Sequence, residues 1–252
     1  MIGVFDSGVG GLSVLREVRQ LLPEADLLYA ADRARAPFGT RPLEEVSSIS
    51  HEIAAWLIDE GADCLVVACN TASAAALESI RAAHPDLPVV GMEPAVKPAA
   101  AATASGTVAV FATAATFQGR LFDSVVQRFA TGVEVLTRAC PEWVEMVEAG
   151  TIDGSEAEEA VEIAVQPAME AGADRIVLAC THFSFLAPVI EAVSQIPVID
   201  PAPAVAAQVQ RVVPHPGGSA SILLAASGDR DEFGRLAREV AGISSPVIPL
   251  RP

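Results

Sequence analysis

Short apolar runs alternate with longer amphipathic segments along almost the whole chain. The runs are unbroken by polar residues and rich in Val, Ile, Leu and Ala, which is typical of strands buried in a parallel sheet. Turn residues such as Pro23, Gly61 and Gly172 separate the segments. The expected strands are Ile2–Phe5, Leu27–Ala30, Cys64–Ala68, Pro88–Gly91, Val108–Phe111, Glu134–Thr137, Arg175–Ala179, Val198–Ile199 and Ser221–Ala225. The expected helices lie near residues 11–22, 42–60, 72–84, 94–103, 116–130, 155–171, 185–194, 202–213 and 230–241.

One segment of the chain occurs twice. Residues 60–73 read EGADCLVVACNTAS, and residues 171–184 read AGADRIVLACTHFS. The alignment of the two copies gives Cys69 and Cys180 equivalent positions, each after an apolar run and before small polar residues. We therefore expect each cysteine where a buried strand ends and a helix begins, which is the edge of an open α/β sheet that binds ligands.

The repeat predicts an α/β fold with two similar domains. The start of the chain, IGVFDS, also resembles VAVFAT at 108–113. We expect each domain to be a mainly parallel sheet flanked by helices, with pseudo-two-fold symmetry and the active site between the domains. The strand and helix expected over 221–241 follow the completed second half and should return to the first. The predicted domains are residues 1–96 with 208–252, and residues 97–207.

Paired cysteines at matching strand ends indicate acid/base chemistry. A helix N-terminus is expected to lower the pKa of each thiol. Two thiols on opposite faces of one carbon suit a reaction that removes a proton from one face and returns a proton to the other. Asp6 should lie beside Cys69 on the same sheet edge, and His182 follows Cys180 by two residues. Short polar residues at the ends of elements are expected to cradle an anion: Ser7, Asn70, Thr71, Thr113, Thr116 and Thr181.

Composition excludes several other functions. The chain of 252 residues is 51% hydrophobic and has a net charge of −16, the wrong sign for a nucleic-acid surface. No apolar run is long enough to span a membrane, and no secretory signal is visible, so we expect a cytoplasmic protein with free thiols. The spacing of Cys64, Cys69 and His182 is irregular for zinc, and we expect no metal.

Two familiar cofactors are also disfavoured. Gly8-Val9-Gly10-Gly11 follows the first strand, but Ser13 stands where a dinucleotide fingerprint requires glycine. We instead expect a tight turn that directs backbone N–H groups toward an anion. Lys97 is the only lysine and lies away from both cysteine motifs, which argues against a pyridoxal Schiff base.

The motifs resemble those of the bacterial glutamate racemases, a cofactor-independent family within the aspartate/glutamate racemase superfamily. The similar segments run from residue 2 to about 238: VFDSGVGGLSVLREV, ADRARAPFGTRP, VVACNTASAAAL, GMEPAVKPA, VLACTHFSFLAPVI, IDPAPAVA and ASGDRDEFGRLA. The resemblance implies that Cys69 takes the α-proton of D-glutamate with help from Asp6. It implies that Cys180 takes that of L-glutamate with help from His182 and Glu148. The implied substrate-holding residues are Ser7, Pro37, Phe38, Gly39, Asn70, Thr71, Thr113, Thr116 and Thr181.

The resemblance also implies a homodimer and a role in supplying D-glutamate for peptidoglycan synthesis. The chain departs from the family pattern at a few positions. Phe38 stands where Tyr is usual, Phe183-Ser184 where Tyr-Pro is common, and Ala31 and Arg33 where Gly and a small polar residue are usual. Two alternatives therefore stay open: a related racemase acting on aspartate or another small acid such as a hydantoin, and a non-catalytic protein that binds an acidic amino acid.

Overall fold

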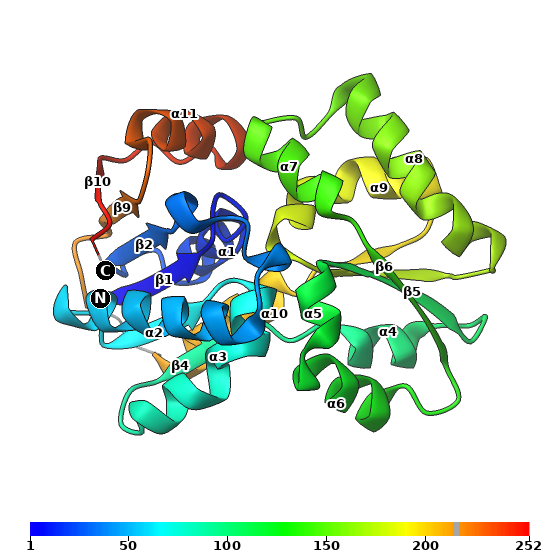
Figure 1. Ribbon diagram of the computed structural model, residues 1–252, viewed down its shortest axis with the longest axis horizontal. Helices are drawn as coiled ribbons and strands as arrows, with labels where there is room; N and C mark the ends of the chain where they lie inside the picture. Colours follow the sequence, from blue (N-terminus) through cyan, green and yellow to red (C-terminus); the bar gives the residue numbers. More distant parts are fainter. Residues whose placement is uncertain (214–216, 252) are drawn as a thin grey trace.

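The computed structural model describes residues 1–213 and 217–251, which form two parallel β-sheets flanked by helices (Figure 1). The first sheet has the strand order β10-β9-β2-β1-β3-β4, and the second has the order β6-β5-β7-β8. The strands are β1 Ile2–Asp6, β2 Leu27–Ala31, β3 Cys64–Val67, β4 Val89–Gly91, β5 Thr107–Ala112, β6 Glu134–Ala139, β7 Arg175–Ala179, β8 Val198–Ile199, β9 Ile222–Ala226 and β10 Val247–Pro249.

Helices connect the strands and cover the sheets. The α-helices are α1 Leu12–Leu21, α2 Leu43–Asp59, α3 Asn70–Ala83, α4 Val96–Ala102, α5 Ala114–Gln118, α6 Arg120–Phe129, α7 Pro141–Ala149, α8 Gly154–Glu170, α9 Ala187–Ser194, α10 Ala202–Val212 and α11 Arg230–Ala241. Three short 3-10 helices are η1 Arg33–Arg35, η2 Phe38–Thr40 and η3 Thr181–Phe185. None of the helices in the described ranges is long and apolar enough to cross a membrane.

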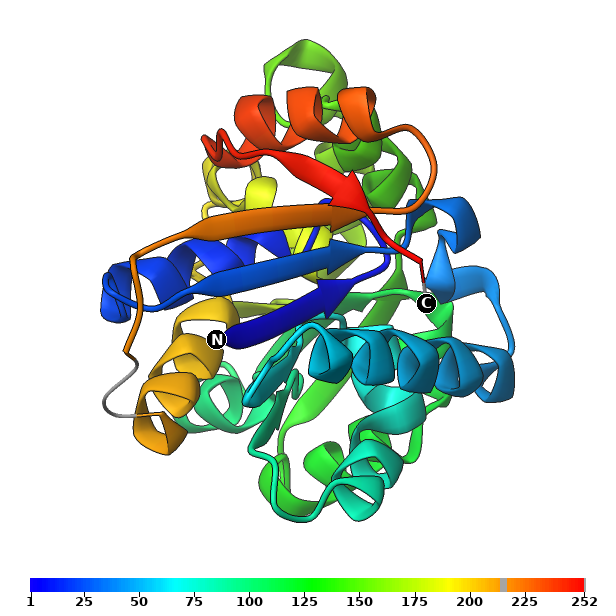
Figure 2. The same ribbon diagram turned by 90° about the vertical axis from the view of Figure 1, so that its left-hand side faces the viewer.

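The sequence repeat corresponds to a repeat of strand order. In the first sheet β1 lies between β2 and β3, and in the second β5 lies between β6 and β7. The order β2-β1-β3-β4 is thus matched by β6-β5-β7-β8. The α/β fold with two similar parallel sheets, predicted from the sequence, is confirmed. Figure 2 shows the strands of the first sheet running side by side between two layers of helices.

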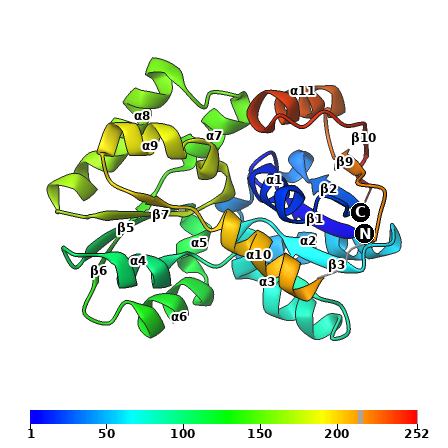
Figure 3. The same cartoon turned by 180° about the vertical axis from the view of Figure 1, so that it is seen from behind.

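The chain returns to the first sheet at its end, as the sequence predicts, because β9 pairs in parallel with β2. The short strand β10 pairs with β9 and was not predicted. Helix α10 packs against α1 of the first domain (Figure 3). The predicted boundary at residue 208 falls inside this helix, and the exact division of the chain into domains stays a prediction.

The largest apolar core joins the two domains. Val9 and Leu12 from the first domain belong to the same buried cluster as Trp143 and Phe183 from the second. Trp143 is fully buried, with its ring 5.2 Å from that of Phe111 and 5.0 Å from that of Phe183. Because these contacts lie next to the sheet edges, the packing of the core fixes how the two edges face each other.

Two helices differ from the prediction. The helix expected over 116–130 is divided at Gly119 into α5 and α6, where the glycine backbone is extended. Close packing requires glycine there, because a Cβ would lie 2.7 Å from the Cβ of Ala74. Helix α7 was not predicted at all, although Pro141 at its first turn and Gly150 at its end are ordinary helix signals.

We expect Trp143→Ala to lower the free energy of unfolding by about 3–5 kcal/mol, because it removes a fully buried aromatic side chain from the shared core. Trp56→Ala is the matched control, since Trp56 is only partly buried and should cost roughly 1–2 kcal/mol. Urea unfolding followed by circular dichroism measures both. Equal losses would contradict a special contribution of the shared core.

Candidate active site

Cys69 and Cys180 occupy equivalent ends of β3 and β7. Cys69 is the N-cap residue of α3, and Cys180 is the N-cap residue of η3. Each residue is only 6% exposed, and both line one cavity of about 180 Å³ between the domains. The other lining residues are Ser7, Pro37, Phe38, Gly39, Thr40, Asn70, Thr71, Thr113, Ala114, Ala139, Pro141, Val144, Glu145, Thr181 and His182. The predicted residues Asp6, Thr116 and Glu148 lie behind this lining and bond to residues within it.

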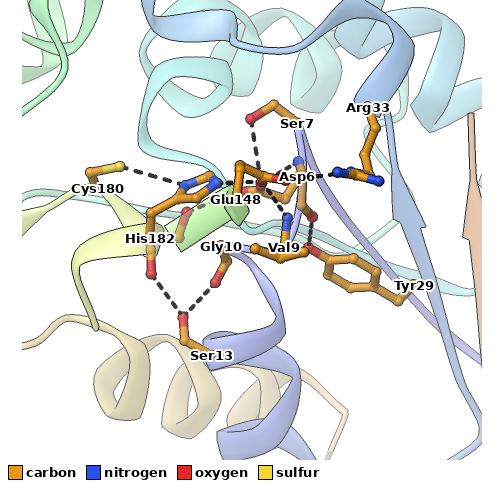
Figure 4. Close-up of polar contacts among 12 residues, drawn as sticks. Asp6, Ser7, Val9, Gly10, Ser13, Tyr29, Arg33, Glu148, Cys180 and His182 are labelled. Atoms are coloured by element: carbon orange, nitrogen blue, oxygen red, sulfur yellow. Dashed lines mark hydrogen bonds and ion pairs between the residues drawn. The ribbon is translucent and has the colours of Figure 1, made fainter. Parts of the chain in front are cut away.

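A linear series of side chains leads away from the Cys180 sulfur (Figure 4). The Nδ1 atom of His182 lies 3.8 Å from Sγ of Cys180, and its Nε2 donates to Oε1 of Glu148 at 2.7 Å. Burial disfavours a charged imidazole, but contacts with Cys180 and Glu148 outweigh burial and raise the pKa of His182 well above its ordinary value. The arrangement is that of a thiol, an imidazole that holds its proton tightly and a carboxylate that orients the imidazole.

Glu148 in α7 is bound from both domains. Its Oε1 also accepts the backbone N–H of Val9 at 2.7 Å, and its Oε2 lies 3.4 Å from Nε of Arg33. Burial alone would raise the pKa of this carboxyl. The hydrogen bond and charge of His182, the Val9 N–H and the Arg33 cation together lower it. Glu148 is therefore an ionised acceptor for His182.

The groups around Cys69 differ from those around Cys180. Sγ of Cys69 accepts the backbone N–H of Ala72 at 3.4 Å. Burial and the negative charge of Asp6 raise the pKa of the Cys69 thiol well above its ordinary value. The expectation of a lowered pKa is thus wrong for Cys69, because the penalty for burying a thiolate exceeds the effect of the helix N-terminus.

Asp6 is fully buried at the end of β1. Its carboxylate accepts the N–H of Gly8 at 2.7 Å, the hydroxyl of Thr181 at 2.9 Å and that of Ser7 at 3.4 Å. Burial raises the pKa of Asp6 despite these donors and the nearby charge of His182. Asp6 thus holds its proton more tightly than an exposed aspartate.

The glycine-rich turn does bring N–H groups to anions, and these anions are side chains of the protein itself. Gly8 N–H binds Asp6, and Val9 N–H binds Glu148. Glycine is required for close approach: a Cβ on Gly8 would overlap the Glu148 carboxylate, and one on Gly10 would overlap the His182 ring and lie 2.6 Å from Oγ1 of Thr181. The turn lets the two domains touch at the active site.

Hydroxyl groups from both domains meet at the opposite side of the cavity. Oγ1 of Thr71 lies 2.9 Å from Oγ1 of Thr113, which in turn lies 2.9 Å from Oγ1 of Thr116. Asn70 lines the cavity, and both polar atoms of its amide are buried without a hydrogen-bond partner within residues 1–213 and 217–251. A buried amide of this kind is available to a polar ligand.

Comparison with known proteins decides the family. The family model described as Asp/Glu/Hydantoin racemase matches residues 2–209, which is most of the chain. A relative from Roseiflexus sp. (strain RS-1), named glutamate racemase, is 48% identical over 244 residues, covering 93% of this chain and 90% of the relative.

This chain belongs to the Asp/Glu/Hydantoin racemase family.

Solved racemase structures share the whole architecture. Glutamate racemase isoform RacE1 from Bacillus anthracis superposes with a TM-score of 0.88 at 29% identity, covering 100% of this chain and 97% of that one. Escherichia coli glutamate racemase, solved in complex with L-glutamate and the activator UDP-MurNAc-Ala, gives the same TM-score and identity over 98% and 96% of the two chains.

Some lining residues of this racemase were missed from the sequence. Pro141, Val144 and Glu145 reach the cavity from α7, and Ala139 reaches it from the end of β6. Recognition of α7 from its terminal Pro and Gly would have indicated them, because residues at helical spacing from Glu148 share its face. The sequence predicts that the turn containing Val9 directs N–H groups toward an anion, but no signal identifies the Glu148 carboxylate as the acceptor.

A second hollow in the racemase differs in chemistry from the cavity of the two cysteines. A larger hollow of about 250 Å³ lies between β5, β6 and α8, and its lining contains no thiol, carboxylate or histidine. Across the residues that the structure describes, no group of three or more His, Cys, Asp or Glu could hold a metal ion. Cys64 opens β3, whereas Cys69 follows its end.

We expect Gly10→Ala to reduce activity about 100-fold while the protein still folds, because the added Cβ displaces His182 or holds the domains apart. Steady-state racemisation and circular dichroism measure the two properties. Gly217→Ala is the matched control, since a Cβ there meets nothing within 4 Å. Unchanged activity in Gly10→Ala would show that the close approach is not needed.

The raised pKa predicts how Cys69 reacts with iodoacetamide, because only the thiolate is alkylated. In the free protein the alkylation rate of Cys69 should keep rising about tenfold per pH unit beyond pH 9. Peptide mass spectrometry after timed reaction follows this residue alone. A plateau below pH 8 would mean that Cys69 is already a thiolate at neutral pH.

Proposed function

We propose that the protein is a glutamate racemase, an isomerase that interconverts L- and D-glutamate with two thiols and without a cofactor. The observation that carries the proposal is the pair Cys69 and Cys180, one from each domain, on equivalent strand ends of one cavity. The names of the relatives and the L-glutamate in the Escherichia coli structure support glutamate as the substrate.

Two such groups on opposite faces of the α-carbon invert its configuration while the substrate stays bound. From L-glutamate, the Cys180 thiolate removes the α-proton, and the electron pair of that C–H bond stays on the α-carbon as a carbanion. The Cys69 thiol then gives its proton to the opposite face. The reaction leaves Cys180 protonated and Cys69 ionised, and the reverse reaction starts from that state. His182, oriented by Glu148, serves as the proton partner of Cys180, and Asp6 serves Cys69.

The lining supplies what a small substrate with two carboxylates needs. The amide of Asn70 and the hydroxyls of Thr71 and Thr113 are placed to donate to carboxylates, and Thr116 fixes Thr113. Ser7 and Thr181 also line the cavity, and their hydroxyls donate to Asp6 in the free protein. Pro37, Phe38 and Gly39 form an opposing wall. A cavity of about 180 Å³ suits a small molecule, since sites for drug-sized ligands begin at roughly 300 Å³. Burial from water strengthens these contacts as negative charge develops at the α-carbon.

The product D-glutamate would supply peptidoglycan synthesis. The homodimer and the cytoplasmic location stay predictions from the sequence, and sedimentation of the purified protein tests the first of them.

We expect Cys69→Ser and Cys180→Ser each to lower kcat/KM at least about 1000-fold, because each removes one of two bases that must act in turn. The loss must be equal in both directions, since L- and D-glutamate have equal free energies. Polarimetry measures the rates, and in heavy water the first product from either enantiomer should carry deuterium at the α-carbon. Cys64→Ala is the matched control, as this buried thiol does not line the cavity.

The same assays distinguish the alternatives. Turnover of aspartate equal to or faster than that of glutamate would favour a related racemase with another substrate. This alternative is considered because Phe38, which lines the cavity, stands where Tyr is usual in the family. Tight binding of glutamate with no α-proton exchange would indicate a protein that binds without catalysis. Full activity in either cysteine-to-serine variant would overturn the two-thiol mechanism.

A further inference from the structure

Arg33 lies behind the Cys180 half of the site and has no part in the mechanism described so far. Its guanidinium is mostly buried, with 14% of the side chain exposed. Nε lies 3.4 Å from Oε2 of Glu148 in the second domain, and Nη1 lies 2.9 Å from Oε2 of Glu232 in α11. In Figure 4 Arg33 approaches Glu148 from the side away from His182.

The segment that carries Arg33 is fixed to the first domain. The backbone N–H of Ala34 donates to Oγ of Ser227 at 2.9 Å, and that hydroxyl donates to Asp32 at 2.8 Å. Glu232 is held at the start of α11, where its N–H donates to Asp229 at 3.0 Å. The cation therefore reaches Glu148 from an anchored position and crosses the domain boundary.

The two oxygens of Glu148 are bound by different partners. Oε1 accepts from both Val9 N–H and His182 Nε2, whereas Oε2 is bound by Arg33. A carboxylate held at one oxygen can rotate about its last torsion, and a charge-assisted contact at the other oxygen opposes that rotation. Arg33 also separates two like charges, because Glu148 and Glu232 share it.

We propose that Arg33 is a positioning residue for the Cys180 half of the active site: it fixes the Glu148 carboxylate, which in turn orients His182 beside the Cys180 sulfur. The proposal rests on the racemase function proposed above. Arg33 does not line the cavity, so its effect on catalysis passes through Glu148.

The test compares Arg33→Gln with Arg33→Lys, which keeps the charge. For Arg33→Gln we expect kcat/KM to fall about five- to tenfold in both directions, with KM changed less than about twofold, as for loss of one partly buried charged contact. Arg33→Lys should recover part of the loss. Arg235→Gln is the matched control, since it breaks the exposed ion pair with Glu239 on the same helix as Glu232.

Isotope effects identify which half of the site has changed. Slower proton removal by Cys180 makes that step more rate-limiting, so the deuterium effect on kcat/KM for α-deuterated L-glutamate should rise in Arg33→Gln. The deuterium effect on kcat/KM for α-deuterated D-glutamate should fall. Cys69 removes that deuteron, and this step becomes less rate-limiting than the slowed proton transfer at Cys180. A global loss of stability would not move the two values in opposite directions.

The pH profile gives a second readout. The charged and titratable groups that face Glu148 are Asp6, Tyr29, Arg33 and His182. Arg33 favours the ionised carboxylate, so its removal raises the pKa of Glu148 and should move the acidic limb of the kcat profile to higher pH. If Arg33→Gln folds poorly by circular dichroism, Glu232→Gln is the second variant: it removes the other ion pair that holds Arg33 in place, with an expected loss of about twofold.

The outcomes separate this proposal from the function on which it rests. If the wild-type protein does not racemise glutamate, the proposed function fails. If the wild type is active but Arg33→Gln matches Arg235→Gln in rate, isotope effects and pH profile, the positioning role of Arg33 is wrong and the proposed function stands.

Discussion

The active site depends on one constraint: two buried carboxylates must be hydrogen-bonded, and each obtains a donor from the opposite domain. Asp6 in the first domain accepts the hydroxyl of Thr181 in the second. Glu148 in the second domain accepts the backbone N–H of Val9 in the first. Burying a charge with too few donors is costly, and each carboxylate draws on both domains: Asp6 also accepts the N–H of Gly8, and Glu148 also accepts from Nε2 of His182. The hydrogen bonds that join the two domains therefore also fix the charged groups that lie beside the thiols.

This constraint explains residues that have no chemistry of their own. Gly8 and Gly10 allow Glu148 and His182 to reach the turn after β1, where any side chain would intervene. Trp143 lies on α7 five residues before Glu148 and packs in the core shared by both domains. The apolar core thus holds the second domain at the distance that the Val9 N–H requires, and packing and hydrogen bonding support the same closed arrangement.

Much of the fold and part of the candidate site were predictable from the sequence, because they follow from local patterns of residues. Features that depend on the packing of distant segments were not. Cys69 and Cys180 could be placed because strand ends are local features and the repeat made them equivalent. Helix α7 was missed because it is only nine residues long, although Pro141 and Gly150 mark its ends and Trp143, Val144 and Val147 recur at helical spacing. The contact of Val9 with Glu148 was predicted only in part: the glycine-rich turn indicated N–H groups directed toward an anion, but nothing in the sequence identified a side chain of the other domain as that anion. The direction of the Cys69 pKa shift depends on burial, which only the packed structure defines.

The two halves of the site place a thiol in equivalent positions but surround it with different side chains. Cys180 has His182 beside it, and the contacts of this imidazole with Cys180 and Glu148 raise its pKa. Cys69 has a buried carboxyl group nearby, and its own raised pKa favours the thiol. Different helpers around the two thiols do not alter the overall reversibility, because the equal free energies of the enantiomers fix the ratio of the two kcat/KM values. Two-fold symmetry is needed only for the position of the two sulfurs, and the surrounding residues are free to differ around an asymmetric substrate.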